Sequence, residues 1–293
     1  MRASLGLAIV LLLSIATAVF AAQAEYLGSF TWSSSHPDFG GLSAISVVEG
    51  GTALIALSDR GFLVSARLSR AGPDQTIDGV KLADIVPLRD DAGQVLPKIE
   101  RDSEGLALAP DGSLFISFEA VHGVGRFDLS GKMVSDGLLR HPHFLTMQLN
   151  SSLESLAIDS DGRLCTAPER SGRLERPFPV YCLVSDEWSQ PFAIPRSEDY
   201  LLSGMDFGPD GRLYVLERVL RGIFFSTRVR SFALVGDRLS DERLHIQTPG
   251  GTHDNLEGIS VWRDTAGALR VSLVSDDNFK IFQRTEIVEY RLP

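Results

Sequence analysis

The feature that most constrains the fold is an internal repeat, in which one pattern recurs five times along the chain. Each copy has two short segments where apolar residues alternate with small or polar ones, joined by a turn. Three turns contain Asp-Gly, at Asp111-Gly112, Asp161-Gly162 and Asp210-Gly211. Alternation with a period of two is typical of β-strands, and glycine supplies the positive φ that tight hairpin turns require. Each copy is therefore predicted to be a hairpin. The copies begin at Gly41, Glu104, Glu154, Ser203 and Glu257.

The spacing of the copies, about 50 residues, predicts a β-propeller. Strand-like stretches such as 125–129 and 229–235 follow the hairpins, and no helical period is sustained along the chain. We therefore expect an all-β, single-domain propeller over residues 25–293. At ~40 to 45 residues for a four-stranded blade, this length predicts six blades, with five as the alternative. The segment 79–86, in the longest interval between copies, is either outer strand, an insertion or a degenerate blade.

The beginning of the chain predicts export. Arg2 precedes an apolar run over residues 5–20, and the small residues that follow this run end in Ala22-Gln23-Ala24. A basic start, a short apolar core and a small-residue end are typical of a secretory signal peptide. We therefore assign residues 1–24 to a signal peptide and expect a periplasmic or secreted protein. An uncleaved membrane anchor is the alternative.

The chain has two cysteines, Cys165 and Cys182, each in a strand-like segment. Disulfides persist in oxidising compartments, and neighbouring antiparallel strands would bring the two residues together. A disulfide is the expectation, and two free buried thiols are the alternative.

The net charge of −10 argues against nucleic acid or an anionic membrane as a partner. We expect no membrane association after signal cleavage, a monomer, and a small anionic or ester molecule as the ligand. An acidic exported protein also meets metal cations readily.

Carboxylates stand at both ends of the predicted hairpins. Because the first and second strands of a blade are antiparallel, the start of one and the end of the other lie at the same mouth of the channel. Crowded carboxylates need a counter-charge, and oxygen ligands favour calcium, with magnesium as the alternative. Purely structural roles, as partners of turn amides or arginines, are the competing interpretation. The predicted ligands are Asp59, Glu104, Glu119, Glu154, Glu169, Glu217, Glu257, Asp276, Asp277 and Asn278, with Asp102 and Asn255 at the same mouth.

Three kinds of side chain could carry chemistry at this mouth. Arg60 and Arg218 directly follow predicted ligands and could counter negative charge. His253 leads into Glu257 and could act as a general acid or base, although a rim histidine without a chemical role is the alternative. Sequence motifs of serine hydrolases, P-loops and dinucleotide sites do not occur. The predicted catalytic residues are Glu104, Glu154, Glu257, His253, Arg60 and Arg218.

Several short motifs, taken together and in order, resemble a known family, the phytase-like or "esterase-like activity of phytase" domain of secreted bacterial proteins. The resemblance implies a propeller that hydrolyses phosphate or carboxylic esters. A metal-stabilised binding propeller of the cell envelope and a gluconolactonase-like lactonase are the alternatives. The motifs are Gly41-Leu-Ser, Ser58-Asp59-Arg60-Gly61, Asp102-Ser-Glu104-Gly, Leu153-Glu154-Ser, Leu216-Glu217-Arg218, Asn255-Leu-Glu257-Gly and Leu273-Val-Ser-Asp-Asp-Asn-Phe279.

Overall fold

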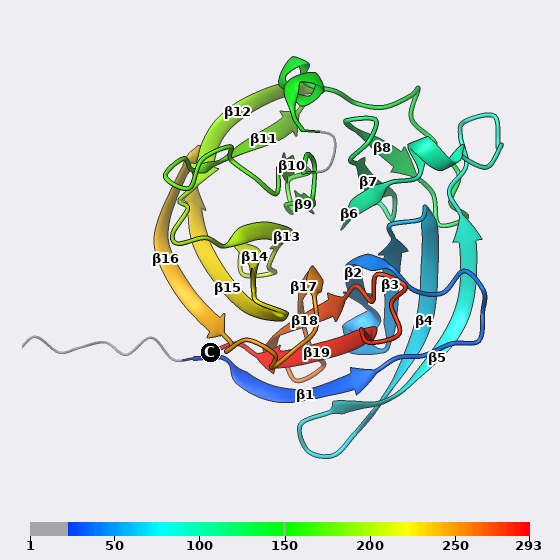
Figure 1. The fold of residues 1–293 in the computed structure, drawn as a ribbon, viewed down its shortest axis with the longest axis vertical. Coiled ribbons are helices and arrows are strands. Elements are labelled where there is room, and N and C mark those ends of the chain that lie inside the picture. The colour runs from blue at the N-terminus through cyan, green and yellow to red at the C-terminus, as the bar shows by residue number, and fades with distance from the viewer. Residues whose placement is uncertain (1–22, 149–150) are drawn as a thin grey trace, which may run out of the picture.

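The computed structural model describes residues 23–148 and 151–293, which form five antiparallel sheets around a central channel (Figure 1). The prediction of an all-β propeller is confirmed. The expected number of six blades is wrong, and the alternative of five is correct. Long outer strands account for the difference: the segment 79–86 lies in β5 (Thr76–Pro87), the outer strand of the first blade, and is neither an insertion nor a blade of its own. The signal-peptide prediction covers residues 1–24, of which residues 1–22 lie outside the described part of the chain.

The blades follow one another in sequence, and each contributes its first strand to the channel wall (Figure 1). The first blade contains β2 (Leu42–Val48), β3 (Ala53–Ser58), β4 (Phe62–Ala71) and β5, and the second contains β6 (Ser103–Leu108), β7 (Leu114–Phe118) and β8 (Gly123–Phe127). The third contains β9 (Ser155–Ile158), β10 (Leu164–Ala167), β11 (Phe178–Val184) and β12 (Glu187–Ile194). The fourth contains β13 (Leu201–Phe207), β14 (Arg212–Arg221), β15 (Phe224–Val235) and β16 (Arg238–Gln247). The fifth contains β17 (Leu256–Arg263), β18 (Leu269–Ser275), β19 (Glu286–Arg291) and β1 (Glu25–Thr31). Short 3-10 turns occur at Glu49–Gly51, Lys98–Glu100 and Pro142–Thr146.

The ring is closed by pairing between the first and last strands. β1 runs antiparallel to β19, from Glu25 opposite Arg291 to Thr31 opposite Glu286. A strand from the start of the chain thus completes the last blade, which leaves fewer exposed edges for pairing with other chains.

The hydrophobic core lies between neighbouring blades. One buried cluster combines Leu42 and Leu54 of the first blade with Trp262, Val274 and Ile287 of the fifth. Alternate side chains of each strand face one neighbouring sheet or the other, as the period of two in the sequence predicts. Among the described residues, no helix is long and apolar enough to cross a membrane.

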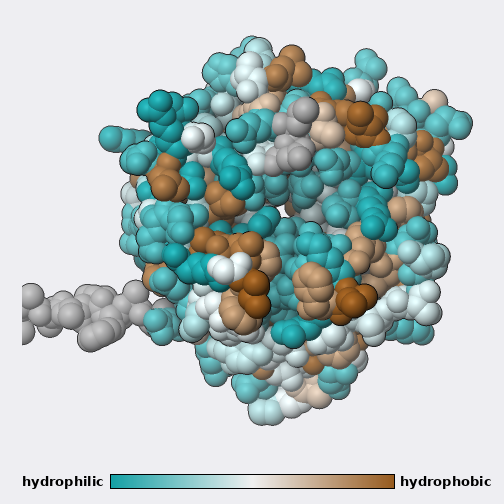
Figure 2. All heavy atoms as spheres, in the orientation of Figure 1, coloured by the Kyte–Doolittle hydropathy of each residue, from teal (hydrophilic) through white to brown (hydrophobic). Residues whose placement is uncertain are grey.

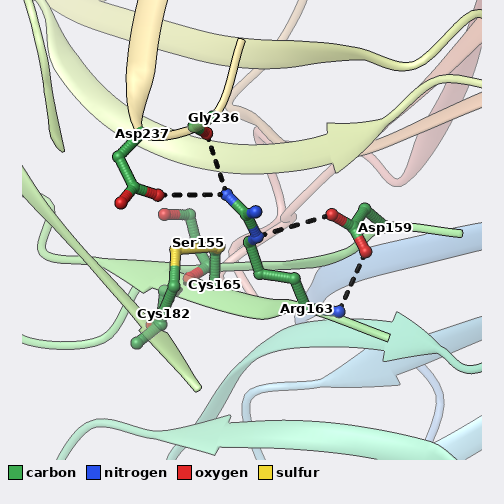
Figure 3. The surroundings of a disulfide bond; sticks show 8 residues. Ser155, Asp159, Arg163, Cys165, Cys182, Gly236 and Asp237 are labelled. Atoms are coloured by element: carbon green, nitrogen blue, oxygen red, sulfur yellow. Dashed lines mark hydrogen bonds and ion pairs between the residues drawn. A yellow bond between two sulfur atoms is a disulfide. The ribbon is translucent and has the colours of Figure 1, made fainter. Parts of the chain in front are cut away.

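The two cysteines form a disulfide between neighbouring strands (Figure 3). Cys165 on β10 stands directly opposite Cys182 on β11, so the predicted pairing is confirmed. Nearby, Arg163 forms ion pairs with Asp159 and Asp237, and the second pair links the third blade to the fourth. A disulfide fits a protein of the periplasm or the extracellular space.

Replacing both cysteines with alanine should lower the free energy of unfolding by about 3 kcal/mol, because the bond closes a short loop that the unfolded chain would otherwise leave open. The two residues are 17 apart in sequence. Urea unfolding of the double variant and of reduced wild type would measure the change. Equal midpoints for oxidised and reduced protein would show that the bond adds nothing to stability.

Candidate functional site

Three glutamates project into one mouth of the channel from the starts of inner strands. The pairing with the second strand is irregular in both β6 and β17: it skips two residues between Ser103 and Leu106, and one residue between Leu256 and Gly258. Such a β-bulge leaves a residue outside the ladder and redirects its side chain. Glu104 and Glu257 occupy these bulges, and Glu154 holds the corresponding place just before β9.

In the other two blades this bulge position is a serine. The hydroxyl of Ser43 donates to the carbonyl oxygen of Ser103 at 2.9 Å, and that of Ser203 donates to the carbonyl oxygen of Leu256 at 3.3 Å. Both bonds join an inner strand to the inner strand of the next blade. The first and fourth blades therefore use this position for contact between blades, whereas the other three place a carboxylate there.

The second strands end in another ring of side chains at the same mouth. The backbone N–H groups of Asp59, Glu119 and Asp276 donate to carbonyl oxygens at the starts of their first strands, at 2.8, 2.9 and 2.9 Å. In the fourth blade the register pairs Leu202 with Glu217 and Leu201 with Arg218. Arg218, and not Glu217, therefore occupies the position of these acids.

Glu217, which was predicted to be a metal ligand, therefore does not face the channel mouth. Because side chains alternate along a strand, an offset of one residue turns Glu217 to the opposite face of β14. There it is fully buried, and both of its oxygens accept hydrogen bonds from Arg228 and Arg230 of β15, at 2.6 to 3.0 Å. No oxygen remains for a cation, so we do not retain Glu217 as a candidate ligand.

The carboxyl groups at the mouth have raised pKa values. Burial is the main cause for Glu104 and Glu154, whose pKa values lie well above the usual range, and neighbouring carboxylates add to the shift. Burial likewise raises the pKa of Glu119 to about 7 and that of Asp276 to about 8. These groups are therefore held in a crowded space from which water is largely excluded, and a cation would relieve their repulsion.

One group of acids has the geometry of a cation site. A carboxylate oxygen from each of Asp102, Glu104 and Glu119 lies within 4.8 Å of the other two. Calcium takes oxygen ligands at about 2.3 to 2.6 Å, so one ion can contact all three. In the fifth blade, the buried Asn255 donates to Glu257 at 2.8 Å, while its own side-chain oxygen has no hydrogen-bond partner among the described residues. The donors present fit a hard cation.

A cavity of about 870 Å³ adjoins this group and carries three positive side chains. Arg60, Lys98 and Arg101 line it together with Asp59 and Asp102. The guanidinium of Arg60 stacks on Phe279, 3.1 Å from the ring centroid, and the buried Nε of Arg101 has no hydrogen-bond partner in residues 23–148 and 151–293. Hydrophilic residues also surround the central opening on the face shown in Figure 2. The cavity can hold an anionic group beside the acids.

Two predicted site residues, His253 and Asp277, lie elsewhere or are already engaged. His253 packs in the outer part of the fifth blade, where its Nε2 is 2.9 Å from the hydroxyl of Tyr290, so it is not at the acidic mouth. Asp277 accepts from the backbone N–H of Gly41 at 2.9 Å and from Thr285, and so fastens the loop after β18 to the first blade. Asn278 donates its backbone N–H to Asp276 at 2.7 Å, a bond that does not use its side chain, so Asn278 stays a candidate ligand.

The contact between that loop and the first blade explains why residue 41 is a glycine. Gly41 has a φ of +61°, and a Cβ at this position would overlap the carboxylate of Asp59 and the ring of Phe279. Only glycine therefore fits between these two side chains.

Asp206 on β13 was not identified from the sequence, because it lies in mid-strand and shares no position with the repeated acids. Its Oδ2 accepts from the backbone N–H of Val261 in the next blade at 2.6 Å, and burial raises its pKa to about 7. The carboxyl thus contributes to blade packing and not to the mouth.

The Asp206→Asn variant should be less sensitive to pH than the wild type. The folded pKa is raised above the unfolded value, so Asp206's contribution to stability is complete at pH below about 4 and is lost as the pH rises to about 7. The stability of the variant relative to wild type should therefore increase by up to about 1.4 kcal/mol per pH unit across this window. Urea unfolding at pH 4 to 8 in chelator would show it, and a constant difference would contradict it.

These features define a five-bladed propeller with an acidic channel mouth and a basic cavity beside it. Residues 37–279 match the model of the phytase-like family described as "esterase-like activity of phytase", and the chain belongs to this family. A search of curated proteins found no significant match.

Several solved propeller structures are similar in fold. A gluconolactonase from Xanthomonas campestris is 16% identical, with a TM-score of 0.49 over 92% of this chain and 96% of that protein. The PQQ-bound aldose sugar dehydrogenase from Streptomyces coelicolor is 13% identical, with a TM-score of 0.45 over 90% and 98%. Virginiamycin B lyase from Staphylococcus aureus is 13% identical, with a TM-score of 0.45 over 92% and 100%.

Proposed function

We propose that this chain is an exported hydrolase of phosphate or carboxylic esters that depends on a divalent metal ion, with calcium preferred over magnesium. One observation carries the proposal: the oxygen ligands Asp102, Glu104 and Glu119 adjoin a cavity lined by three cationic side chains. Magnesium requires a tighter, near-octahedral arrangement and retains waters, whereas calcium accepts several carboxylates at flexible distances.

The residues of the cavity would bind and orient the substrate. Arg60, Lys98 and Arg101 can donate charged hydrogen bonds to an anionic group, which favours phosphate esters over neutral acyl esters. Asp59 lies in the same cavity wall, and burial raises its pKa to about 7. At neutral pH its carboxyl can therefore accept or donate a proton near the bound ester.

A calcium ion held by Asp102, Glu104 and Glu119 would supply a Lewis acid for an ester oxygen and increase the acidity of a nearby water. Because these acids are buried, solvent would screen the charge of the ion only weakly. Because their pKa values are raised, binding of the ion should release protons from them.

Calcium-stimulated hydrolysis of a phosphomonoester is the expected activity. A phosphomonoester, a phosphodiester, a short acyl ester and a sugar lactone would be assayed with calcium, with magnesium and with chelator. We expect the phosphomonoester to be the best substrate and the chelator to remove its turnover. Hydrolysis of the lactone alone would indicate a gluconolactonase-like lactonase. Calcium-dependent thermal stability without any turnover would indicate a binding propeller of the envelope and would contradict the hydrolase proposal.

A further inference from the structure

Arg218 occupies a place in the second-strand ring where the other four blades have a carboxylate. Those carboxylates are Asp59, Glu119, Glu169 and Asp276. The guanidinium of Arg218 lies between its two neighbouring blades. Its Nη2 is 2.9 Å from Oε1 of Glu257 in the fifth blade and 3.4 Å from Oε1 of Glu169 in the third. One nitrogen thus links two carboxylates of different sheets.

We propose that Arg218 is a built-in cation that fills a second cation site, so that the mouth binds one calcium ion and not two. The inference rests on the proposed function, since it takes Asp102, Glu104 and Glu119 as the first calcium site. The second site consists of the carboxylate oxygens of Glu169 and Glu257 that Arg218 now contacts, next to the amide of Asn255 that is hydrogen-bonded to Glu257.

The charges at the mouth divide into two groups. Asp102, Glu104 and Glu119 all belong to the second blade, and in the described part of the chain none of them forms an ion pair with lysine or arginine. On the other side, Arg218 is attracted by Glu257, Glu169, Glu154 and Asp276. Burial alone would lower the pKa of Arg218, but these carboxylates outweigh burial and raise it. The guanidinium therefore neutralises one group and leaves the other for an added cation.

An unsatisfied oxygen marks the group around Arg218 as a place for a ligand. Asn255 is 3% exposed, and its amide nitrogen donates to Oε1 of Glu257 at 2.8 Å. Within the described part of the chain, its amide oxygen is buried without a hydrogen-bond partner, and so is Nε of Arg218. Buried polar atoms are normally paired, so this unpaired acceptor, on a residue hydrogen-bonded to Glu257, is available to a cation that replaces the guanidinium.

The donor set around Nη2 suits calcium. Glu169 and Glu257 each offer a carboxylate oxygen, and Asn255 is hydrogen-bonded through its amide nitrogen to the same oxygen of Glu257. The contacts of Nη2, at 2.9 and 3.4 Å, are longer than calcium–oxygen distances of about 2.3 to 2.6 Å by at most about 1.1 Å. A modest inward movement of the two glutamates would complete the contacts. Without the guanidinium, these buried carboxylates must protonate or take up a cation.

Calcium stoichiometry tests the proposal directly. Equilibrium dialysis and calorimetry would count the ions bound at pH 8 by wild type, Arg218→Gln, Arg218→Lys and the matched control Arg170→Gln. Arg170 also contacts Glu169, at 3.0 Å, but its side chain is 53% exposed. We expect one ion for wild type, Arg218→Lys and Arg170→Gln, and two for Arg218→Gln, with a larger calcium-dependent rise in melting temperature.

The outcomes separate this proposal from the proposed function. One ion in both wild type and Arg218→Gln, or two in both, would overturn the role of Arg218 while leaving a calcium site in place. No ion in wild type but one in Arg218→Gln would support the role of Arg218 and contradict the calcium-dependent function. If Arg218→Gln folds only when calcium is present, the ion has replaced the guanidinium, which supports the proposal. Two ions in Arg218→Lys would also overturn it, because that variant keeps the charge.

Discussion

Replacing Glu217 with glutamine is expected to lower the free energy of unfolding by about 3 to 5 kcal/mol, because the change leaves two buried arginines without their counter-charge. Glu217 is fully buried, and its two oxygens accept hydrogen bonds from Arg228 and Arg230, which are themselves 4% and 2% exposed. A glutamine of the same shape retains one acceptor but removes the charge. The two guanidinium groups would then repel each other within the fourth blade.

The matched control is Glu242→Gln. Glu242 also contacts Arg230, at 2.7 Å, but its side chain is 46% exposed. Removing this partner should cost less than about 1 kcal/mol, as for other exposed pairs. Chemical unfolding of both variants and wild type at pH 7 would measure the two costs. If Glu217→Gln were as stable as Glu242→Gln, Glu217 would not be the centre of a buried ion cluster.

Replacing Glu104 with glutamine should have two opposite effects, one without calcium and one with it. Without calcium the variant should be more stable than wild type, since it removes one carboxylate from a buried, mutually repelling group. With calcium, wild type should gain about 2.7 kcal/mol at a concentration a hundred times its Kd, and the variant should gain little. The affinity for calcium should fall by at least about 100-fold, and calcium-stimulated hydrolysis should fall with it.

The exposed Glu100 provides the control, because it lies four residues away on the Lys98–Glu100 turn, and Glu100→Gln should behave as wild type. Thermal unfolding in chelator and in calcium, with calorimetric titration, covers both effects. A Glu104→Gln protein with unchanged calcium affinity would remove Glu104 from the metal site. A lower stability in chelator would show that this glutamate has a structural role instead.

Part of the candidate site could be predicted from the repeat. Glu104, Glu154 and Glu257 recur at one position of the pattern, and Asp59, Glu119, Glu169 and Asp276 recur at another. Recurrence places them at one mouth because every blade has the same strand directions. The prediction for Glu217 was wrong because an alignment of the repeated sequences does not reveal the strand register. An offset of one residue in that register moves a side chain to the opposite face of the sheet.

The basic cavity and the position of His253 could not be predicted in the same way. Lys98 and Arg101 lie in a connection between blades that has no counterpart in the other repeats, so nothing in the pattern places them beside Asp59. His253 precedes an inner strand, but its ring turns outward to Tyr290 of β19. Tyr290 is distant in sequence and is brought near only when β19 joins the last blade.

The sequence by itself determined the class of fold, the hairpin turns, the pairing of the cysteines and the gathering of acids at one mouth, because these depend on local period and on repetition. Tertiary structure decided the number of blades, since strand lengths and the closing pair of β1 with β19 are set by packing around the ring. It also decided that Arg218, and not Glu217, faces the acids. The physical reason is the same in each case: register and closure depend on contacts between segments far apart in the chain, which a local pattern does not specify.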